Sequence, residues 1–386
     1  MTARIISIPG AVSTTITTSG QLLLLSDALR NTKGGTDALL TNTSGTDNTA
    51  IGYNALKLDT ASFNTAFGSY ALDANTSGIN NTAMGYNALG ANISGSNNTM
   101  IGFQAGLVNQ ANNNTLVGYG AGDANTTGTR NTALGSNALS ANISGSDCTI
   151  IGYRAGFANT AANSTFIGSG TGESNTTGQY NIAVGKDALG NNISGSYNIM
   201  IGYQAGYNNI ASSNTFIGYE AGDENETGTY NVALGKDALG VNISGSNNTT
   251  IGYRAGFIAT GAENVYVGSG CDGSAAARTG AIGIGKDVKV TADNTWVIGT
   301  IGKKQAIVEG VNAAMGVATM ISGGITVNNT IVTDNSRIFL SIQDPNGGTV
   351  GVEYISTRTS GVSFTILSDS DPADTSIIVW EIKEPN

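Results

Sequence analysis

The sequence contains no histidine, and only 11% of its 386 residues are charged. The commonest general base and metal ligand is therefore missing, and no nucleophile-elbow, P-loop or EF-hand pattern takes its place. Basic residues are scarce too, because 17 lysines and arginines stand against 27 aspartates and glutamates. An acidic chain without a basic run is a poor partner for nucleic acid. We therefore expect no enzyme, no cofactor, no metal site and no nucleic-acid binding.

Long hydrophobic runs and prolines are also rare. The longest aliphatic run near the start is Leu22–Leu25, whereas a membrane-spanning helix needs about 20 apolar residues. We expect neither a secretion signal nor membrane insertion. No proline stands between Pro9 and Pro345. Since proline has no N–H to donate to a β-ladder, this absence favours unbroken strand pairing along that stretch.

Glycine, by contrast, is abundant and regularly spaced. The tripeptide Ile-Gly-Tyr or Ile-Gly-Phe recurs every 50 residues from Ile51 to Ile251, and glycines divide each 50-residue unit into steps of 16, 17 and 17. A step of this length suits one coil of a β-solenoid, with two short strands and two turns. The sequence therefore predicts an all-β fold, a parallel β-roll of 16–17-residue coils within a 50-residue super-repeat.

The three residues before each of these glycines predict how the coils pack. The first and third positions, such as Thr49 and Ile51, are β-branched or large and apolar in coil after coil. A spacing of two puts them on one face of a strand, and we expect that face to fill the coil. The middle position is apolar as well, so we expect it to pack between identical chains around a rotation axis. The predicted trimer interface consists of Met100, Leu116, Ile150, Phe166, Met200, Phe216 and Tyr266.

Asparagine marks the other half of each coil. The tetrapeptides NTSG at Asn75 and NISG at Asn92 recur along the array and end in glycine. They fit the pattern of glycosylation sites, but their strict period favours tight turns held by local side-chain bonds. Cys148 takes one of the asparagine positions and Cys271 takes an alanine position, in coils about 33 Å apart. That separation is too long for a disulfide, so we expect two buried thiols.

Residues 31–299 resemble the head repeats of trimeric autotransporter adhesins and of related phage and algal-virus fibres. The resemblance rests on phrases such as NTAIGYNAL, NTAFGSYAL and NTAMGYNAL. The segment ADNTWVIGTIGKKQAIVEGV at 292–311 is similar to the stretch that closes such arrays in phage fibres. These heads are left-handed parallel β-rolls with three chains packed around one axis. The resemblance therefore implies a left-handed, homotrimeric roll.

Four segments follow along the chain: an N-terminal attachment segment at 1–30, the β-roll array at 31–299, a neck at 300–315 and a β-sandwich tip at 316–386. The tip resembles the small β-sandwich at the ends of phage and virus structural proteins. Alternating apolar residues predict its strands at 337–343, 351–358, 363–367 and 376–382. We expect a structural fibre or adhesin of a virion or extracellular surface structure. The alternative is a self-assembling filament or sheath protein built from end-to-end trimers.

Recognition is expected at the loops of the tip, because rigid β-scaffolds commonly carry binding residues on loops. Tyr354, Arg358, Asp369 and Asp371 supply a stacking face, a fork of donors and two acceptors, which suit a sugar. The predicted partners are identical chains, a host-surface receptor carrying a glycan, and a larger particle or neighbouring trimer contacted through residues 1–30.

Overall fold

The computed structural model describes residues 25–299 and six further strands between residues 313 and 383. These residues form strands and turns without a helix, so this part of the chain holds no helix that could cross a membrane. The chain divides into two compact units, Met1–Val297 and Ile298–Asn386. Residues 1–24 of the predicted attachment segment and residues 300–312 of the predicted neck lie outside the described residues.

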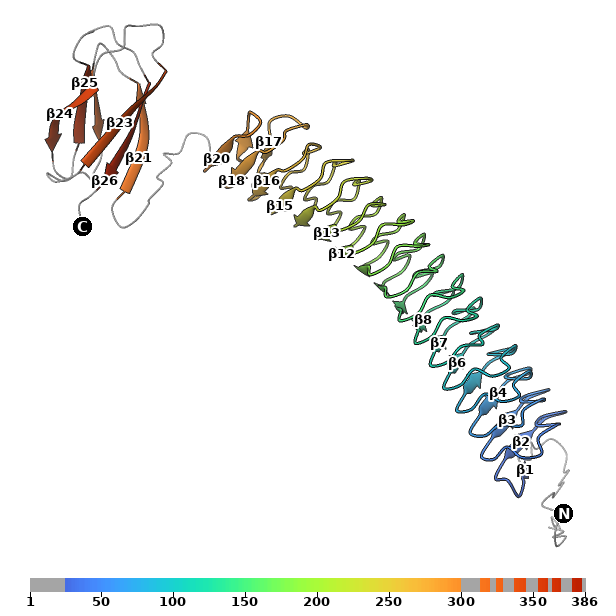
Figure 1. The fold of residues 1–386 in the computed structure, drawn as a ribbon. Coiled ribbons are helices and arrows are strands. Elements are labelled where there is room, and N and C mark those ends of the chain that lie inside the picture. Colours follow the sequence, from blue (N-terminus) through green and yellow to red (C-terminus); the bar gives the residue numbers. More distant parts are fainter. Residues whose placement is uncertain are drawn as a thin grey trace, which may run out of the picture. The chain divides into compact units, whose positions relative to one another are not determined.

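The first unit is a parallel β-solenoid of about 16 coils, each about 17 residues long. Figure 1 shows the coils stacked one on the next from β1 to β20. One three-residue strand per coil pairs in parallel with the strand of the following coil, and β1 pairs with β2 in antiparallel orientation. The predicted all-β solenoid is confirmed, whereas its hand and its trimeric state stay predictions. The strands of this unit are β1 (Leu25–Ser26), β2 (Thr32–Gly34), β3 (Thr49–Ile51), β4 (Thr65–Phe67), β5 (Thr82–Met84), β6 (Thr99–Ile101), β7 (Thr115–Val117), β8 (Thr132–Leu134), β9 (Thr149–Ile151), β10 (Thr165–Ile167), β11 (Ile182–Val184), β12 (Ile199–Ile201), β13 (Thr215–Ile217), β14 (Val232–Leu234), β15 (Thr249–Ile251), β16 (Val265–Val267), β17 (Asp272–Gly273), β18 (Ile282–Ile284), β19 (Lys289–Val290) and β20 (Trp296–Ile298).

The two faces of these strands are the reverse of the prediction. In strands β3 to β16 the middle residue is enclosed by its own coil, whereas the first and third residues are half-buried or exposed. A side chain enclosed by its own coil has no surface left for a second chain. The predicted trimer interface is therefore wrong in its residues. Those fully buried side chains are Met100, Leu116, Ile150, Phe166, Met200, Phe216 and Tyr266.

The coil interior holds one large side chain at the level of the middle residue of the strand, which we call the strand centre. Where the centre is alanine, as at Ala83, the residue six positions later is a fully buried leucine, Leu89. Where the centre is large in strands β6 to β13, as at Phe166, that residue is glycine, and a Cβ on Gly172 would lie 2.6 Å from Cε2 of the ring. Leu89 and Gly172 both adopt a left-handed backbone, with φ of 54° and 58°. The two positions therefore share one volume, which keeps the cross-section of the solenoid constant.

Two columns of buried asparagines run along the solenoid. In the first, Oδ1 of each side chain accepts the backbone N–H of the next member, as Asn98 does from Asn114 at 2.9 Å. In the second, Nδ2 of Asn92 donates to Oδ1 of Asn75 at 2.8 Å and to the carbonyl of Gly95 at 3.0 Å. The glycosylation-like triplets belong to this second column. Because their amide nitrogens are buried and already bonded, the interpretation as structural turns is confirmed.

Both cysteines are free and buried, as predicted. Cys148 stands in the first asparagine column, where its Sγ lies 3.3 Å from the carbonyl oxygen of Ala161. Burial raises the pKa of the Cys148 thiol and raises that of Cys271 to about 11. Both side chains therefore act as neutral packing residues at physiological pH.

The second unit contains two antiparallel sheets of three strands each, which is the composition of a small β-sandwich. The sheet orders are β21-β26-β23 and β22-β25-β24. The four strands predicted from alternation agree with β23 to β26 to within two residues at each end. The strands of this unit are β21 (Ala313–Thr319), β22 (Gly324–Asn328), β23 (Arg337–Asp344), β24 (Glu353–Thr359), β25 (Ser363–Ser368) and β26 (Ile377–Lys383).

Candidate binding surfaces

Two of the four residues predicted to recognise a sugar lie in one strand of the second unit. Tyr354 and Arg358 are both in β24, which pairs with β25, and a register shift interrupts that pairing between them. Asp369 and Asp371 lie outside the described residues. The role of these residues in recognition stays a prediction.

The parallel sheet of the first unit presents one side to solvent. We call this side the outer sheet face, and it consists of the first and third residues of strands β3 to β16. Threonine predominates in its first row, and large aliphatic side chains predominate in its second. Phe67, Leu134 and Ile201 keep exposed fractions of 51%, 47% and 38%. No position of this face carries a charge. A contiguous uncharged surface of this length is typical of an interface with another molecule.

Aromatic residues form a ladder along one edge of the sheet. The rings of Tyr86, Phe103 and Tyr119 follow the coil glycines and are stacked, with centroids 5.3 and 5.2 Å apart. Tyr53 and Tyr70 extend the ladder through edge-to-face contacts. Because the rings cover one another's faces, the ladder mainly ties neighbouring coils together.

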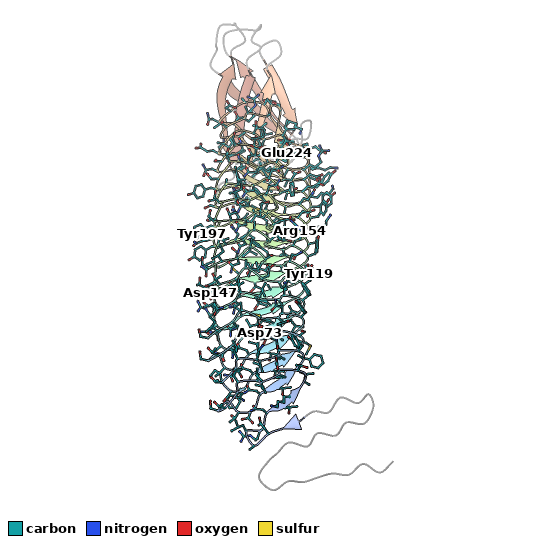
Figure 2. The ribbon with its side chains drawn as sticks, turned by 90° about the vertical axis from the view of Figure 1, so that its right-hand side faces the viewer. Asp73, Tyr119, Asp147, Arg154, Tyr197 and Glu224 are labelled. Atoms are coloured by element: carbon teal, nitrogen blue, oxygen red, sulfur yellow. The ribbon has the colours of Figure 1, made fainter. Side chains whose placement is uncertain are left out.

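The opposite edge carries another stacked pair of tyrosines. In Figure 2, Tyr119 and Arg154 lie on one side of the strands, and Tyr197 and Asp147 lie on the other. The rings of Tyr180 and Tyr197 stack at 5.1 Å between centroids. Arg130 donates two hydrogen bonds to Asp147 in the next coil. These exposed contacts join adjacent coils, and a surface ion pair of this kind contributes little to stability.

Arg154 belongs to the first edge and is fully engaged by its neighbours. Its guanidinium lies over the Phe157 ring at 4.3 Å from the centroid. Its Nε and Nη2 both donate to Oε1 of Glu173 in the next coil, at 2.9 and 2.6 Å. Stacking and ion pairing together leave this arginine little capacity for a ligand.

Two adjoining grooves flank Arg254, which occupies the corresponding place two super-repeats later. The first groove has a volume of about 330 Å³ and is lined in part by Tyr253, Arg254, Phe257, Ser269, Asp272, Asp287 and Lys289. The second has a volume of about 310 Å³ and is lined in part by Glu220, Asp223, Glu224 and Asp237. Burial, reinforced by the neighbouring acidic residues, raises the pKa of Asp223 to about 6. One groove is therefore mixed in charge and the other is acidic.

The carboxylates of the acidic groove do not converge on a metal. Within the described part of the chain, no group of three or more Cys, Asp or Glu side chains could hold a metal ion. The prediction from sequence did not include either groove. The signal that could have revealed the first groove is the departure of Asp272, Gly273 and Lys289 from the residues at corresponding positions of the earlier super-repeats.

Comparison with known proteins concerns the second unit. Residues 312–383 match the family model described as K1 capsule-specific polysaccharide lyase, C-terminal domain. This range contains β21 to β26 and none of the solenoid coils. No curated protein and no solved structure matches the chain. The resemblance of the coils to autotransporter head repeats therefore stays a prediction. The similarity of residues 312–383 to this C-terminal domain, combined with a long β-solenoid, supports a phage tail-fibre-like or tail-spike-like structural protein associated with a virion.

Proposed function

We propose that this chain is the shaft and receptor-binding end of a phage tail fibre or tail spike. The observation that carries the proposal is a solenoid of about 16 coils followed by a domain that matches the C-terminal domain of a capsule-specific lyase. At a rise of about 4.8 Å per coil, the solenoid extends roughly 75 Å. The name of the matching family supports a surface polysaccharide as the receptor. In this proposal residues 1–30 attach the fibre to a larger particle.

We further propose that three identical chains associate through the outer sheet face. An uncharged surface of threonine and aliphatic side chains favours burial against an equally apolar partner, and each Å² of apolar area removed from water contributes about 25 cal/mol. An identical chain offers such a face at the same coil spacing. The association proposed here uses the first and third strand residues, in place of the middle residues predicted from sequence.

In this proposal the chain forms the fibre and binds the receptor, and it does not catalyse a reaction. The sequence has no histidine, the commonest general base in enzymes. The matching family nevertheless includes lyases by name. Incubating the full chain with capsular polysaccharide should therefore give binding without a fall in polymer length, measured by size-exclusion chromatography. Shortened polymer would overturn the non-catalytic part of the proposal.

A truncation after Val311 tests the position of the receptor-binding end. The full chain should bind polysaccharide-coated surfaces, and residues 1–311 should keep their oligomeric state by light scattering yet lose that binding. Equal binding by both proteins would move recognition to the solenoid. Long filaments of the full chain that disappear on truncation, seen by electron microscopy, would favour the alternative of a self-assembling filament.

A further inference from the structure

Arg254 and Arg154 form a matched pair with different surroundings. Each guanidinium stacks on the aromatic ring three residues later, at 4.2 Å for Phe257 and 4.3 Å for Phe157. The acid that holds Arg154 is Glu173, and the corresponding position one hundred residues later is Gly273. Among the residues that the structure describes, the Arg254 guanidinium makes no hydrogen bond or ion pair. Its fork of donors is therefore positioned by stacking but remains open.

The two coils beyond Arg254 also change the charge of the groove. Lys289 stands where the earlier coil has Leu189, and Asp272 stands where it has Gly172. These two residues pair in register between the short strands β17 and β19. The Asp272 carboxylate is buried and accepts the backbone N–H of Ile258 at 3.0 Å and that of Gly273 at 2.8 Å. It therefore bonds to the backbone, and Lys289 forms no ion pair within residues 25–299.

We propose that the groove beside Arg254 binds a carboxylated sugar, independently of the tip. The Arg254 fork would take the carboxylate in two parallel hydrogen bonds, a geometry that a guanidinium matches and that is strong when the arginine is already oriented. Lys289 adds a second positive charge. The exposed Tyr253 ring and the Ser269 hydroxyl line the same groove and suit the apolar face and the hydroxyl groups of a sugar ring.

Volume and charge limit where such a ligand sits. A groove of about 330 Å³ lies at the small end of the range for ligand sites and suits one or two sugar units. The acidic groove on the other side of Arg254 repels anions through Glu220, Asp223, Glu224 and Asp237. The groove on the Lys289 side also holds Asp272 and Asp287, so its two cations balance two carboxylates, and an anionic ligand is favoured there over the acidic groove. An acidic peptide could pair with Arg254 through a carboxylate, but it would make no use of the Tyr253 ring and the Ser269 hydroxyl, which suit a sugar.

The test uses the full chain and trigalacturonate, a carboxylated trisaccharide, with binding measured by saturation-transfer NMR and calorimetry. Arg254→Gln should weaken binding at least tenfold, and Lys289→Leu should weaken it less. The matched control Arg154→Gln removes a charge from the same place in an earlier coil, where Glu173 occupies the guanidinium, and should leave binding unchanged. Thermal unfolding of each variant shows whether the solenoid remains folded.

Three results would overturn the proposal. The first is no binding of trigalacturonate to the wild-type chain, and the second is equal binding by Arg254→Gln and wild type. The third is equally tight binding of trigalacturonate methyl ester, which keeps the hydroxyl groups but lacks the charge. A glutamate-rich peptide that binds more tightly than trigalacturonate, and loses binding in Arg254→Gln, would assign the groove to an acidic protein partner instead. Trigalacturonate binding should survive truncation after Val311, and its loss would assign the site to the tip instead. The truncation test of the tip is made with Arg254→Gln in both proteins, so that a site on the solenoid does not contribute to it.

Discussion

At the scale of single residues, Asp59 interrupts the second asparagine column with a buried carboxyl group. Its Oδ1 accepts Nδ2 of Asn75 at 2.6 Å, whereas its Oδ2 is buried without a partner. Where the column has asparagine, as at Asn109, Nδ2 donates to the carbonyl two residues later, that of Ala111, at 2.9 Å. Asp59 can donate to such a carbonyl only when it is protonated. Burial accordingly raises the pKa of Asp59 to about 6.

This raised pKa predicts a pH-dependent stability with a definite sign. Because the folded pKa lies above the unfolded value of 3.8, the folded chain binds the proton more tightly. The stabilisation is complete below about pH 4 and is lost as the pH rises through about 6, at a total of roughly 3 kcal/mol. Asp59→Asn should remove this part of the pH dependence and raise the melting temperature at pH 7. Melting temperatures of the wild type and Asp59→Asn, measured between pH 4 and 8, test this prediction. If the two melting temperatures change with pH in parallel, the prediction is wrong.

The shared volume at the strand centre predicts a compensating pair of substitutions. Phe166→Ala leaves a cavity and should cost about 3–5 kcal/mol, and Gly172→Leu alone should also destabilise because the ring fills that space. The double variant reproduces the arrangement of Ala83 and Leu89 and should regain most of the loss. Denaturant unfolding of all four proteins gives the coupling energy. Additive losses would show that the two side chains do not share one volume.

The coil length, the fold class and the four later strands of the second unit could be read from the sequence, because glycine spacing and apolar alternation depend on backbone geometry alone. The inward face could not be read from alternation, since a strand of three residues such as Thr99–Ile101 offers apolar residues to both sides. The deciding signal was the residue six positions after the strand centre, leucine after alanine and glycine after a large side chain. For Arg254, comparison of the super-repeats identifies Gly273, but an open guanidinium becomes visible only with its neighbours in space.

At the scale of elements, the first asparagine column is broken at two consecutive coils. Cys148 supplies a sulfur where the column has an amide, and the buried Oγ of Ser164 in the next coil has no partner. An intact member both accepts the next backbone N–H and donates to a carbonyl, as Asn131 does toward Gly145 at 2.8 Å. The stack is therefore weakest in hydrogen bonding at this point of the column. In a solenoid, stability depends on such contacts between neighbouring coils.

Restoring the column should stabilise the solenoid. In the double variant Cys148→Asn and Ser164→Asn, the two amides can form the bonds that their neighbours form, and each buried hydrogen bond gained contributes about 1 kcal/mol. We expect a higher melting temperature than for the wild type. Cys148→Ala with Ser164→Ala is the control, because it fills part of the space without restoring the bonds and should not stabilise. A double asparagine variant that melts no higher than this control would exclude the column as a source of stability.

At the scale of the whole molecule, the coils bury their own middle residues and leave the outer sheet face exposed. Each coil contacts only the coils before and after it. No other part of the solenoid can therefore cover the outer sheet face and remove its apolar side chains from water. The charged and aromatic residues gather along the two edges of the sheet instead, as Figure 2 shows for Arg154 and Asp147. This division predicts that substitutions on the face affect association, whereas substitutions at the strand centre affect folding of the chain itself.

Light scattering tests this division directly. The wild-type chain should have about three times its mass of 39.0 kDa. Leu134→Lys together with Ile201→Lys puts two charges into the outer sheet face, where burial between chains would strip them of water, and should shift the mass toward that of one chain. The β-structure measured by circular dichroism should persist, because neither side chain fills a coil. Ser136→Lys is the matched control, since Lys186 and Lys236 occupy the corresponding edge position in later super-repeats. A wild-type chain that is monomeric in solution, or a trimer that survives both charges on the face, would show that the face serves another partner.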